Sequence, residues 1–235
     1  MDRNLFSGVE AVCFDLFHTL VDVGSVPASV GGYTADILGL DRSAWNGACF
    51  SGAHDICRTT TQLEVIRKMA HHLDPQIPMG LIEEASAARQ RRFDYSLKQV
   101  DGEIVAALAR LQAAGLPLAL VSNASTAEVA AWSDSPLAVL FDVALFSCEC
   151  GHAKPDAQIY HLASERLGVA AAQCLFVGDG GSDEHRGAAA VGMRPVLTTQ
   201  YLGRSYTTEA VEQRRQHVDY EVASVAELPG LLLSA

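Results

Sequence analysis

The amino-acid sequence predicts an α/β fold in which a doubly wound, mostly parallel sheet carries a small, separate all-helical domain. Two observations predict it. Short, continuously apolar segments alternate with helical patterns from residue 101 to residue 198, as in a parallel sheet covered by helices on both faces. A helical stretch of about 75 residues interrupts the alternation after the first apolar segment, which is the size of a small accessory domain.

The first predicted strand is the apolar run Val9 to Asp15, which ends in an acid. Residues 22–97 follow, with apolar residues three to four positions apart, interrupted by the pair Gly31-Gly32 and by Pro75 and Pro78. This spacing predicts several helices. We therefore assign residues 1–21 and 98–235 to the α/β core domain and residues 22–97 to the helical domain.

The second half of the chain supplies the rest of the sheet. Ile104, Leu108 and Leu111 lie on one face of a predicted helix that ends at Gly115. Further strands are predicted at residues 117–122, 143–147, 174–178 and 195–198, further helices at 156–167 and 184–191, and a last strand and closing helix after residue 220. Because ligands of parallel sheets bind beyond the carboxyl ends of the strands, we expect the active residues there.

Composition limits the classes of function. Asp and Glu number 28 against 17 Lys and Arg, a formal net charge of −11 that disfavours binding to nucleic acid or to anionic membranes. No apolar run approaches the roughly 18 residues of a membrane helix, and the first residues lack a signal-peptide pattern. The six cysteines form no CxxC pair, which favours reduced thiols. We expect a cytoplasmic protein with a small-molecule substrate; the oligomeric state stays open.

Polar side chains close each predicted strand. They are Asp15 and Thr19 after the first strand, Ser122 and Asn123 after the second, Lys154 before a helix, and Asp179, Asp183 and Glu184 after a later strand. Converging carboxylates and a lysine suit a divalent cation next to an anionic group, and carboxylates with substrate phosphate are the usual environment of Mg²⁺. The sequence therefore predicts Mg²⁺ as the cofactor.

These segments resemble, in the same order, the four motifs of the haloacid dehalogenase (HAD) superfamily of hydrolases. The matching segments are Phe14-Asp15 to Thr19-Leu20, Ser122-Asn123, Lys154-Pro155 to Tyr160, and Gly178-Asp179 through Asp183 to Ala188. The resemblance implies a Rossmann-type core, a helical cap inserted after the first motif, and hydrolysis of a small phosphorylated metabolite through an aspartyl-phosphate on Asp15.

The same resemblance assigns roles to individual residues. We expect catalytic roles for Asp15, Thr19, Ser122, Asn123 and Lys154, substrate contacts from Ser122, Asn123, Lys154 and His18, and metal contacts from Asp15, the backbone carbonyl of Phe17, Asp179 and Asp183. Glu184 competes with Asp183 for the role of supporting the metal.

Phe17 departs from the phosphatase pattern, which has a second Asp two residues after the nucleophile as general acid and base. The loss of such a group typically costs about 10² to 10⁴ in rate. His18 is a possible substitute. An aromatic residue here is similar to the 2-haloacid dehalogenase branch, which needs no metal and whose substrate carboxylate would be bound by an arginine of the cap, Arg42 or Arg58. A third alternative is an impaired relative that only binds its ligand.

Overall fold

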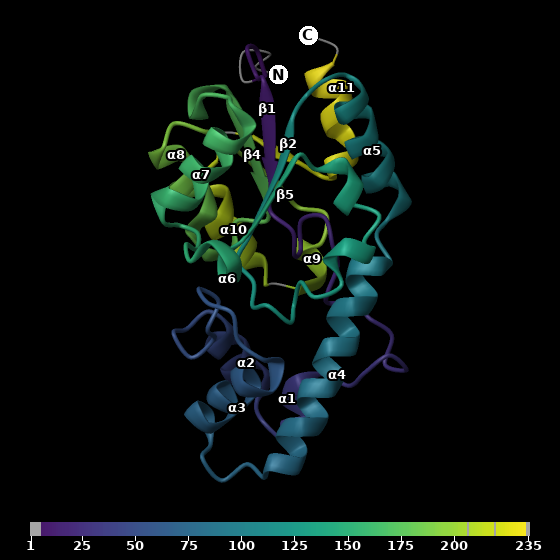
Figure 1. Cartoon of the computed structure of the whole chain (residues 1–235), viewed down its shortest axis with the longest axis vertical. Coiled ribbons are helices and arrows are strands. Elements are labelled where there is room, and N and C mark those ends of the chain that lie inside the picture. The colour runs from purple at the N-terminus through teal and green to yellow at the C-terminus, as the bar shows by residue number, and fades with distance from the viewer. Residues whose placement is uncertain (1–5, 206, 219, 234–235) are drawn as a thin grey trace.

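The computed structural model describes residues 6–205, 207–218 and 220–233, and confirms the predicted α/β fold class. Six parallel strands form one sheet in the order β3-β2-β1-β4-β5-β6. The strands are β1 (Ala11–Phe14), β2 (Leu118–Ser122), β3 (Val143–Phe146), β4 (Cys174–Gly178), β5 (Arg194–Thr198) and β6 (Glu221–Val222). Figure 1 shows the sheet in the upper part of the molecule and a group of helices below it.

The central strand β1 is buried on both faces, which explains its unbroken apolar sequence. Val12 and Phe14 lie in a core cluster that also contains residues of α5 (Gly102–Ala113) and α11 (Leu228–Leu232). Ala11 and Cys13 belong to the opposite cluster, which contains residues of α7 (Ala157–Leu167) and α8 (Glu184–Ala190). The sheet is therefore the middle layer of a three-layer core.

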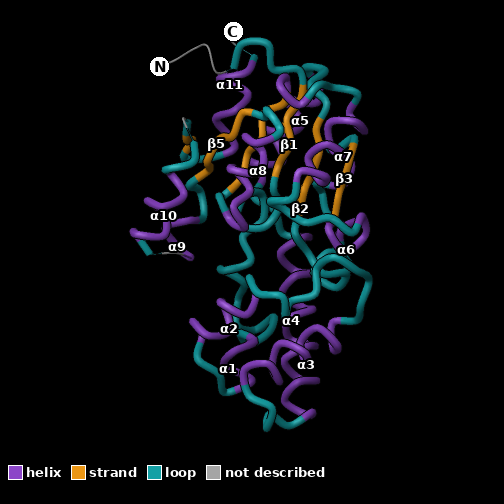
Figure 2. Tube along the Cα trace, turned by 90° about the vertical axis from the view of Figure 1, so that its left-hand side faces the viewer, coloured by secondary structure: helices purple, strands orange, loops and turns teal. Residues whose placement is uncertain are grey.

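Residues 22–97, all of them described, contain helices and turns but no strand. The helices are α1 (Thr34–Leu38), α2 (Arg42–Cys49), α3 (Gln62–Leu73) and α4 (Met79–Lys98), which we call the helical lobe. Asp41 and Thr61 cap α2 and α3 through side-chain oxygens. The lobe has its own apolar cluster around the fully buried Trp45 and Met69. In Figure 2 the lobe lies below the carboxyl ends of the strands.

Three short helices were not expected from the sequence: α6 (Ser147–Cys150), α9 (Leu202–Ser205) and α10 (Thr208–Arg215). Ser147, predicted as the end of a strand, instead begins α6. Helix α10 buries none of its residues, so it gives no apolar pattern to detect. Among the described residues, no helix combines the length and the apolar character that crossing a bilayer requires.

Candidate active site

The site lies where the sheet changes its winding direction. From β1 the chain proceeds to β2 on one side and later to β4 on the other, so the carboxyl ends of β1 and β4 lie side by side. Asp15 follows β1, and its backbone N–H donates to the carbonyl oxygen of Val177 in β4 at 2.9 Å. Asp179 follows β4 directly. The two strand ends thus bring two aspartates together.

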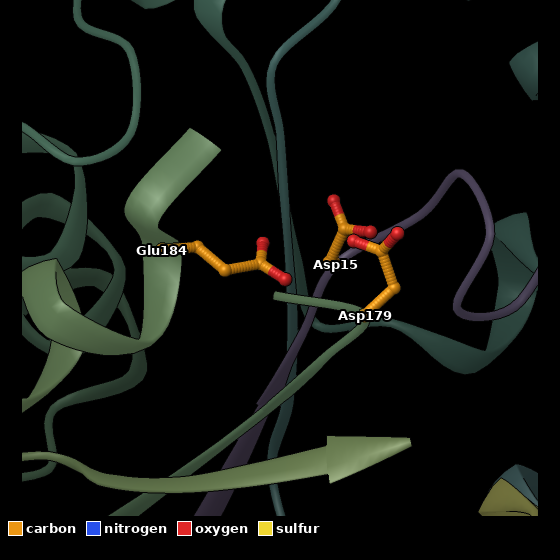
Figure 3. A group of neighbouring side chains, drawn as sticks. All are labelled: Asp15, Asp179 and Glu184. Carbon is orange, nitrogen blue, oxygen red and sulfur yellow. The ribbon is translucent and has the colours of Figure 1, made fainter. Parts of the chain in front are cut away.

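A third carboxylate comes from Glu184, the first residue of α8. Ligand atoms of Asp15, Asp179 and Glu184 all lie within 4.8 Å of one another, and all three residues are buried. Figure 3 shows the three carboxylates pointing toward one another. Gly178 makes this approach possible, because a Cβ there would collide with the Glu184 carboxylate. We call these three residues the carboxylate group.

Lys154 neutralises part of this charge. Its buried Nζ lies 2.5 Å from Oδ1 of Asp15 and 2.6 Å from Oε2 of Glu184. Burial opposes the charged ammonium, but the two carboxylates outweigh it and raise the pKa of Lys154. Lys154 therefore stays protonated between the nucleophile candidate and Glu184.

Asn123 holds Lys154 in place. Its Oδ1 accepts from the backbone N–H of Lys154 at 2.7 Å, and its Nδ2 donates to the Lys154 carbonyl at 2.9 Å. The amide is engaged at both ends by the protein itself. The geometry thus makes Asn123 a residue that positions Lys154, and its expected contact with substrate stays a prediction.

Thr19 and Ser122 complete the surroundings of Asp15. The Thr19 hydroxyl donates to Oδ2 of Asp15 at 2.9 Å and fixes the orientation of the carboxylate. Ser122 is fully buried at the end of β2, and its Oγ makes no hydrogen bond to another described residue. A buried hydroxyl without a partner is costly in a folded protein, and it suits a site that binds a polar ligand.

Glu184 has a pKa well above the usual value of a glutamate. Burial is the largest cause, and with the nearby charges of Asp15 and Asp179 it raises the pKa of Glu184 to about 8 despite the contact with Lys154. The carboxylate also accepts from the backbone N–H of Gly180 at 2.8 Å. The Tyr160 hydroxyl donates to the Glu184 carbonyl at 2.8 Å, which fixes the start of α8.

Asp179 is held by Arg214, a residue that the sequence analysis missed. Arg214 Nη1 lies 2.6 Å from Oδ2 of Asp179 and 2.7 Å from its carbonyl oxygen. Oδ1 accepts from the backbone N–H of Gly181 at 2.8 Å. Arg214 belongs to α10, whose polar sequence carried no signal of a role in the site.

Asp183 was expected to contact the metal, but the structure does not bring it to the carboxylate group. Its side chain is 55% exposed and pairs with Arg186 at 2.8 Å. Asp183 lies just before α8, and Glu184 is the residue that points into the site. Arg42 and Arg58 are likewise exposed and pair with acids of their own lobe, Asp36 and Asp55.

Phe17 and His18 lie in the loop after Asp15. The Phe17 ring packs edge-to-face against Phe93 of α4, with ring centroids 5.1 Å apart. His18 is half-buried, and its backbone has a φ of 62°. The other non-glycine residues with positive φ in the described ranges are Ser182 and Asp183, beside the same site. Backbone strain is thus concentrated in the two loops that carry the site, as is common in functional loops.

A second buried ion cluster links the two parts of the molecule. Glu128, in the loop after β2, lies 2.5 Å from Nη2 of Arg89 in α4 and 3.3 Å from Nε2 of His54 in the helical lobe. The Arg89 guanidinium also lies over the Phe93 ring, 4.6 Å from its centroid. Arg89 and His54 therefore connect the lobe to a core loop close to Phe17.

The donor set of the carboxylate group fits a hard divalent cation. Three carboxylate oxygens from Asp15, Asp179 and Glu184 are the ligand type that Mg²⁺ prefers. Two cationic side chains, Lys154 and Arg214, already contact these oxygens. A cation would thus share the carboxylates with two resident positive charges.

Comparison with known proteins identifies a family, several relatives and structures with the same fold. The sequence pattern of haloacid dehalogenase-like hydrolases matches residues 9–192. The phosphoglycolate phosphatase of Shigella boydii serotype 4 (strain Sb227) is 30% identical over 93% of this chain and 91% of its own length. The (S)-2-haloacid dehalogenase H-109 of Pseudomonas putida is 30% identical over 72% of this chain and 76% of its own. A solved structure of a dehalogenase shares the fold, with a TM-score of 0.67 at 23% identity over 96% of this chain and 98% of that one.

Proposed function

The chain belongs to the haloacid dehalogenase-like hydrolase family, and within it we propose a Mg²⁺-dependent phosphatase that acts on a small phosphorylated metabolite. The observation that carries the proposal is the carboxylate group, in which Asp15, Asp179 and Glu184 meet within 4.8 Å. Lys154 and Arg214 supply two positive charges against these three carboxylates, and a divalent cation would supply the further charge that an anionic substrate requires.

Asp15 is the proposed nucleophile. One of its carboxylate oxygens attacks phosphorus, the bond from phosphorus to the leaving oxygen breaks, and an aspartyl-phosphate remains on Asp15. Water then hydrolyses this acyl phosphate, which releases inorganic phosphate and restores the carboxylate. Thr19 orients Asp15 through Oδ2, and the Lys154 ammonium at Oδ1 offsets the repulsion between two anions.

The remaining site residues bind and position. The buried Ser122 hydroxyl is available to donate to a phosphoryl oxygen, and Asn123 keeps Lys154 in register with Asp15. Asp15, Asp179, Glu184 and the Phe17 carbonyl would hold the divalent cation, which neutralises charge on the attacked group when bound. We assign Glu184, in place of Asp183, to this set because its carboxylate lies inside the group.

Phe17 restricts the substrate class. An apolar ring supplies no proton to the leaving oxygen, so esters with acidic leaving groups, such as aryl and acyl phosphates, should react faster than alkyl phosphates. We propose the helical lobe as the cap over the site, since its residue Phe93 contacts Phe17. A closed cap excludes water from the first half-reaction.

One assay tests the proposal. Purified protein is offered a panel of aryl, acyl and alkyl phosphates, including 2-phosphoglycolate, with Mg²⁺ and with EDTA. We expect phosphate release that requires Mg²⁺ and that falls to background in Asp15→Asn. Activity that persists in EDTA, or in Asp15→Asn, contradicts the mechanism.

A metal-independent 2-haloacid dehalogenase is the second candidate. It is favoured by Phe17, because halide needs no proton to leave, and by Arg214, which already neutralises Asp179. Chloride release from 2-chloropropionate in EDTA would support it and would displace the first proposal. If neither assay shows Asp15-dependent turnover, the chain is a ligand-binding relative.

A further inference from the structure

The contact between Arg214 and Asp179 adds a second cation to the site, beside the Lys154 that the sequence predicted. Lys154 contacts Asp15 and Glu184, whereas Asp179 receives the Arg214 guanidinium on both its carboxylate and its carbonyl oxygen. The Arg214 side chain is only 12% exposed. The contact is therefore largely shielded from solvent, unlike a surface ion pair.

The neighbouring loop is shaped to admit this arginine. Gly180 has a φ of +83°, and a Cβ at that position would lie 3.0 Å from both Cβ and Cγ of Arg214. A side chain at 180 would press on the arginine stem as well as strain the backbone. The absence of a side chain at Gly180 thus lets the stem pass directly over the loop of Asp179.

The contact with Asp179 also attaches helix α10 to the loop after β4. None of its eight residues is buried, so little apolar packing attaches it to the core. Arg215 of the same helix pairs with Glu212 and Glu221 on exposed side chains, where such pairs contribute little. The contact at Asp179 is less exposed than either of these pairs.

We propose that Arg214 is a resident counter-cation, a positioning residue that balances the charge of Asp179 in the metal-free enzyme and competes with the divalent cation for its Oδ2. This inference rests on the proposed Mg²⁺ site. Removal of a unit positive charge this close to a ligand oxygen should tighten binding of a divalent cation by about tenfold or more. Release of Arg214 by the cation should also loosen α10.

The test measures Mg²⁺ binding directly, by isothermal titration calorimetry, in the parent protein, Arg214→Gln, Arg214→Lys and Arg215→Gln. We expect Arg214→Gln to bind Mg²⁺ about tenfold or more tightly than the parent. Arg214→Lys, which keeps the charge, should stay closer to the parent than Arg214→Gln. Arg215→Gln removes the neighbouring, exposed arginine and should leave the affinity unchanged. Equal or weaker binding by folded Arg214→Gln overturns the inference.

The binding experiment can succeed or fail independently of the phosphatase assay. If the parent binds no Mg²⁺ but Arg214→Gln does, the inference stands and Mg²⁺-dependent catalysis by the parent fails. If Arg214→Gln does not fold, hydrogen exchange in the parent decides. We expect the amides of residues 208–215 to exchange faster once Mg²⁺ is bound, whereas unchanged exchange in a protein that binds Mg²⁺ overturns the inference.

Discussion

Phe17 is the residue on which the two proposed chemistries at Asp15 differ most. The ring lies in the loop two positions after Asp15 and packs on Phe93 of the helical lobe. It thus contacts the helical lobe, and in the proposed mechanism it also faces the leaving group. The two roles can be separated by substitution.

We predict that Phe17→Asp raises the activity toward alkyl phosphates relative to aryl phosphates. The new carboxyl can protonate a poor leaving oxygen, and general acid catalysis typically contributes about 10² to 10⁴ in rate. We expect a change of about tenfold or more in the ratio of the two kcat/KM values, because the new group is not positioned by a dedicated partner. Phe17→Leu is the control, since it shortens the aromatic contact without adding an acid. An unchanged ratio in Phe17→Asp would show that this position does not face the leaving group.

At the scale of elements, α8 positions Glu184 because the helix packs very closely against the loop of Lys154 and Pro155. Gly187 allows this approach. A Cβ at 187 would lie 2.7 Å from the Tyr160 hydroxyl oxygen and 2.8 Å from the Pro155 carbonyl oxygen. Helix α8, the Tyr160 hydroxyl and the Pro155 carbonyl thus meet at one point.

We predict that Gly187→Ala lowers the free energy of unfolding by about 1 to 3 kcal/mol, the usual range for overpacking a buried position. It should also reduce turnover, because α8 must move and Glu184 moves with it. Urea unfolding and steady-state kinetics measure the two effects. Gly80→Ala is the matched control, since Gly80 is exposed on α4 with open space around it. Stability equal to that of the parent in Gly187→Ala would contradict the close contact.

The sequence predicts those elements whose apolar pattern is forced by burial. The strand at 174–178 is predicted with the bounds that β4 has, because all five residues are buried. Helix α10 escapes prediction since it buries none of its residues. The choice between Asp183 and Glu184 escapes it too, because the direction of each side chain depends on where α8 begins and not on residue type. Arg214 is found only when the fold brings it to Asp179.

At the scale of the whole molecule, the Glu128 cluster joins the helical lobe to the core. Burial opposes the charge on Glu128, but His54 and Arg89 outweigh it and lower the pKa of Glu128 well below its usual value. Burial alone would lower the pKa of His54, yet the charge of Glu128 prevails and raises it. Arg89 stays charged next to both. His54, at the junction between lobe and core, thus has a pKa above the ordinary value of a histidine.

We predict a pH-dependent role for His54 in stability. Because its pKa is raised in the folded state, its contribution is fully present below the unfolded pKa of about 6.5 and is lost as pH rises through the higher folded value. His54→Ala should therefore lower the melting temperature more at pH 6 than at pH 9. His72→Ala, an exposed change on α3, is the control and should show no such difference. An equal loss at both pH values for His54→Ala would mean that the ion pair with Glu128 adds nothing.

The central place of β1 in the sheet has a consequence for how the chain folds. Val12 lies beside Leu118 and Leu175, so the first strand must wait for partners that are synthesised much later. At about 5 to 20 residues per second, the nearer partner emerges roughly 5 to 20 seconds after β1. The helical lobe has its own apolar cluster, and its collapse in that interval would bring the two ends of the long insertion closer and reduce the entropy lost on closing the loop. We therefore expect the insertion to fold early and to ease the later pairing of β1 with its neighbours.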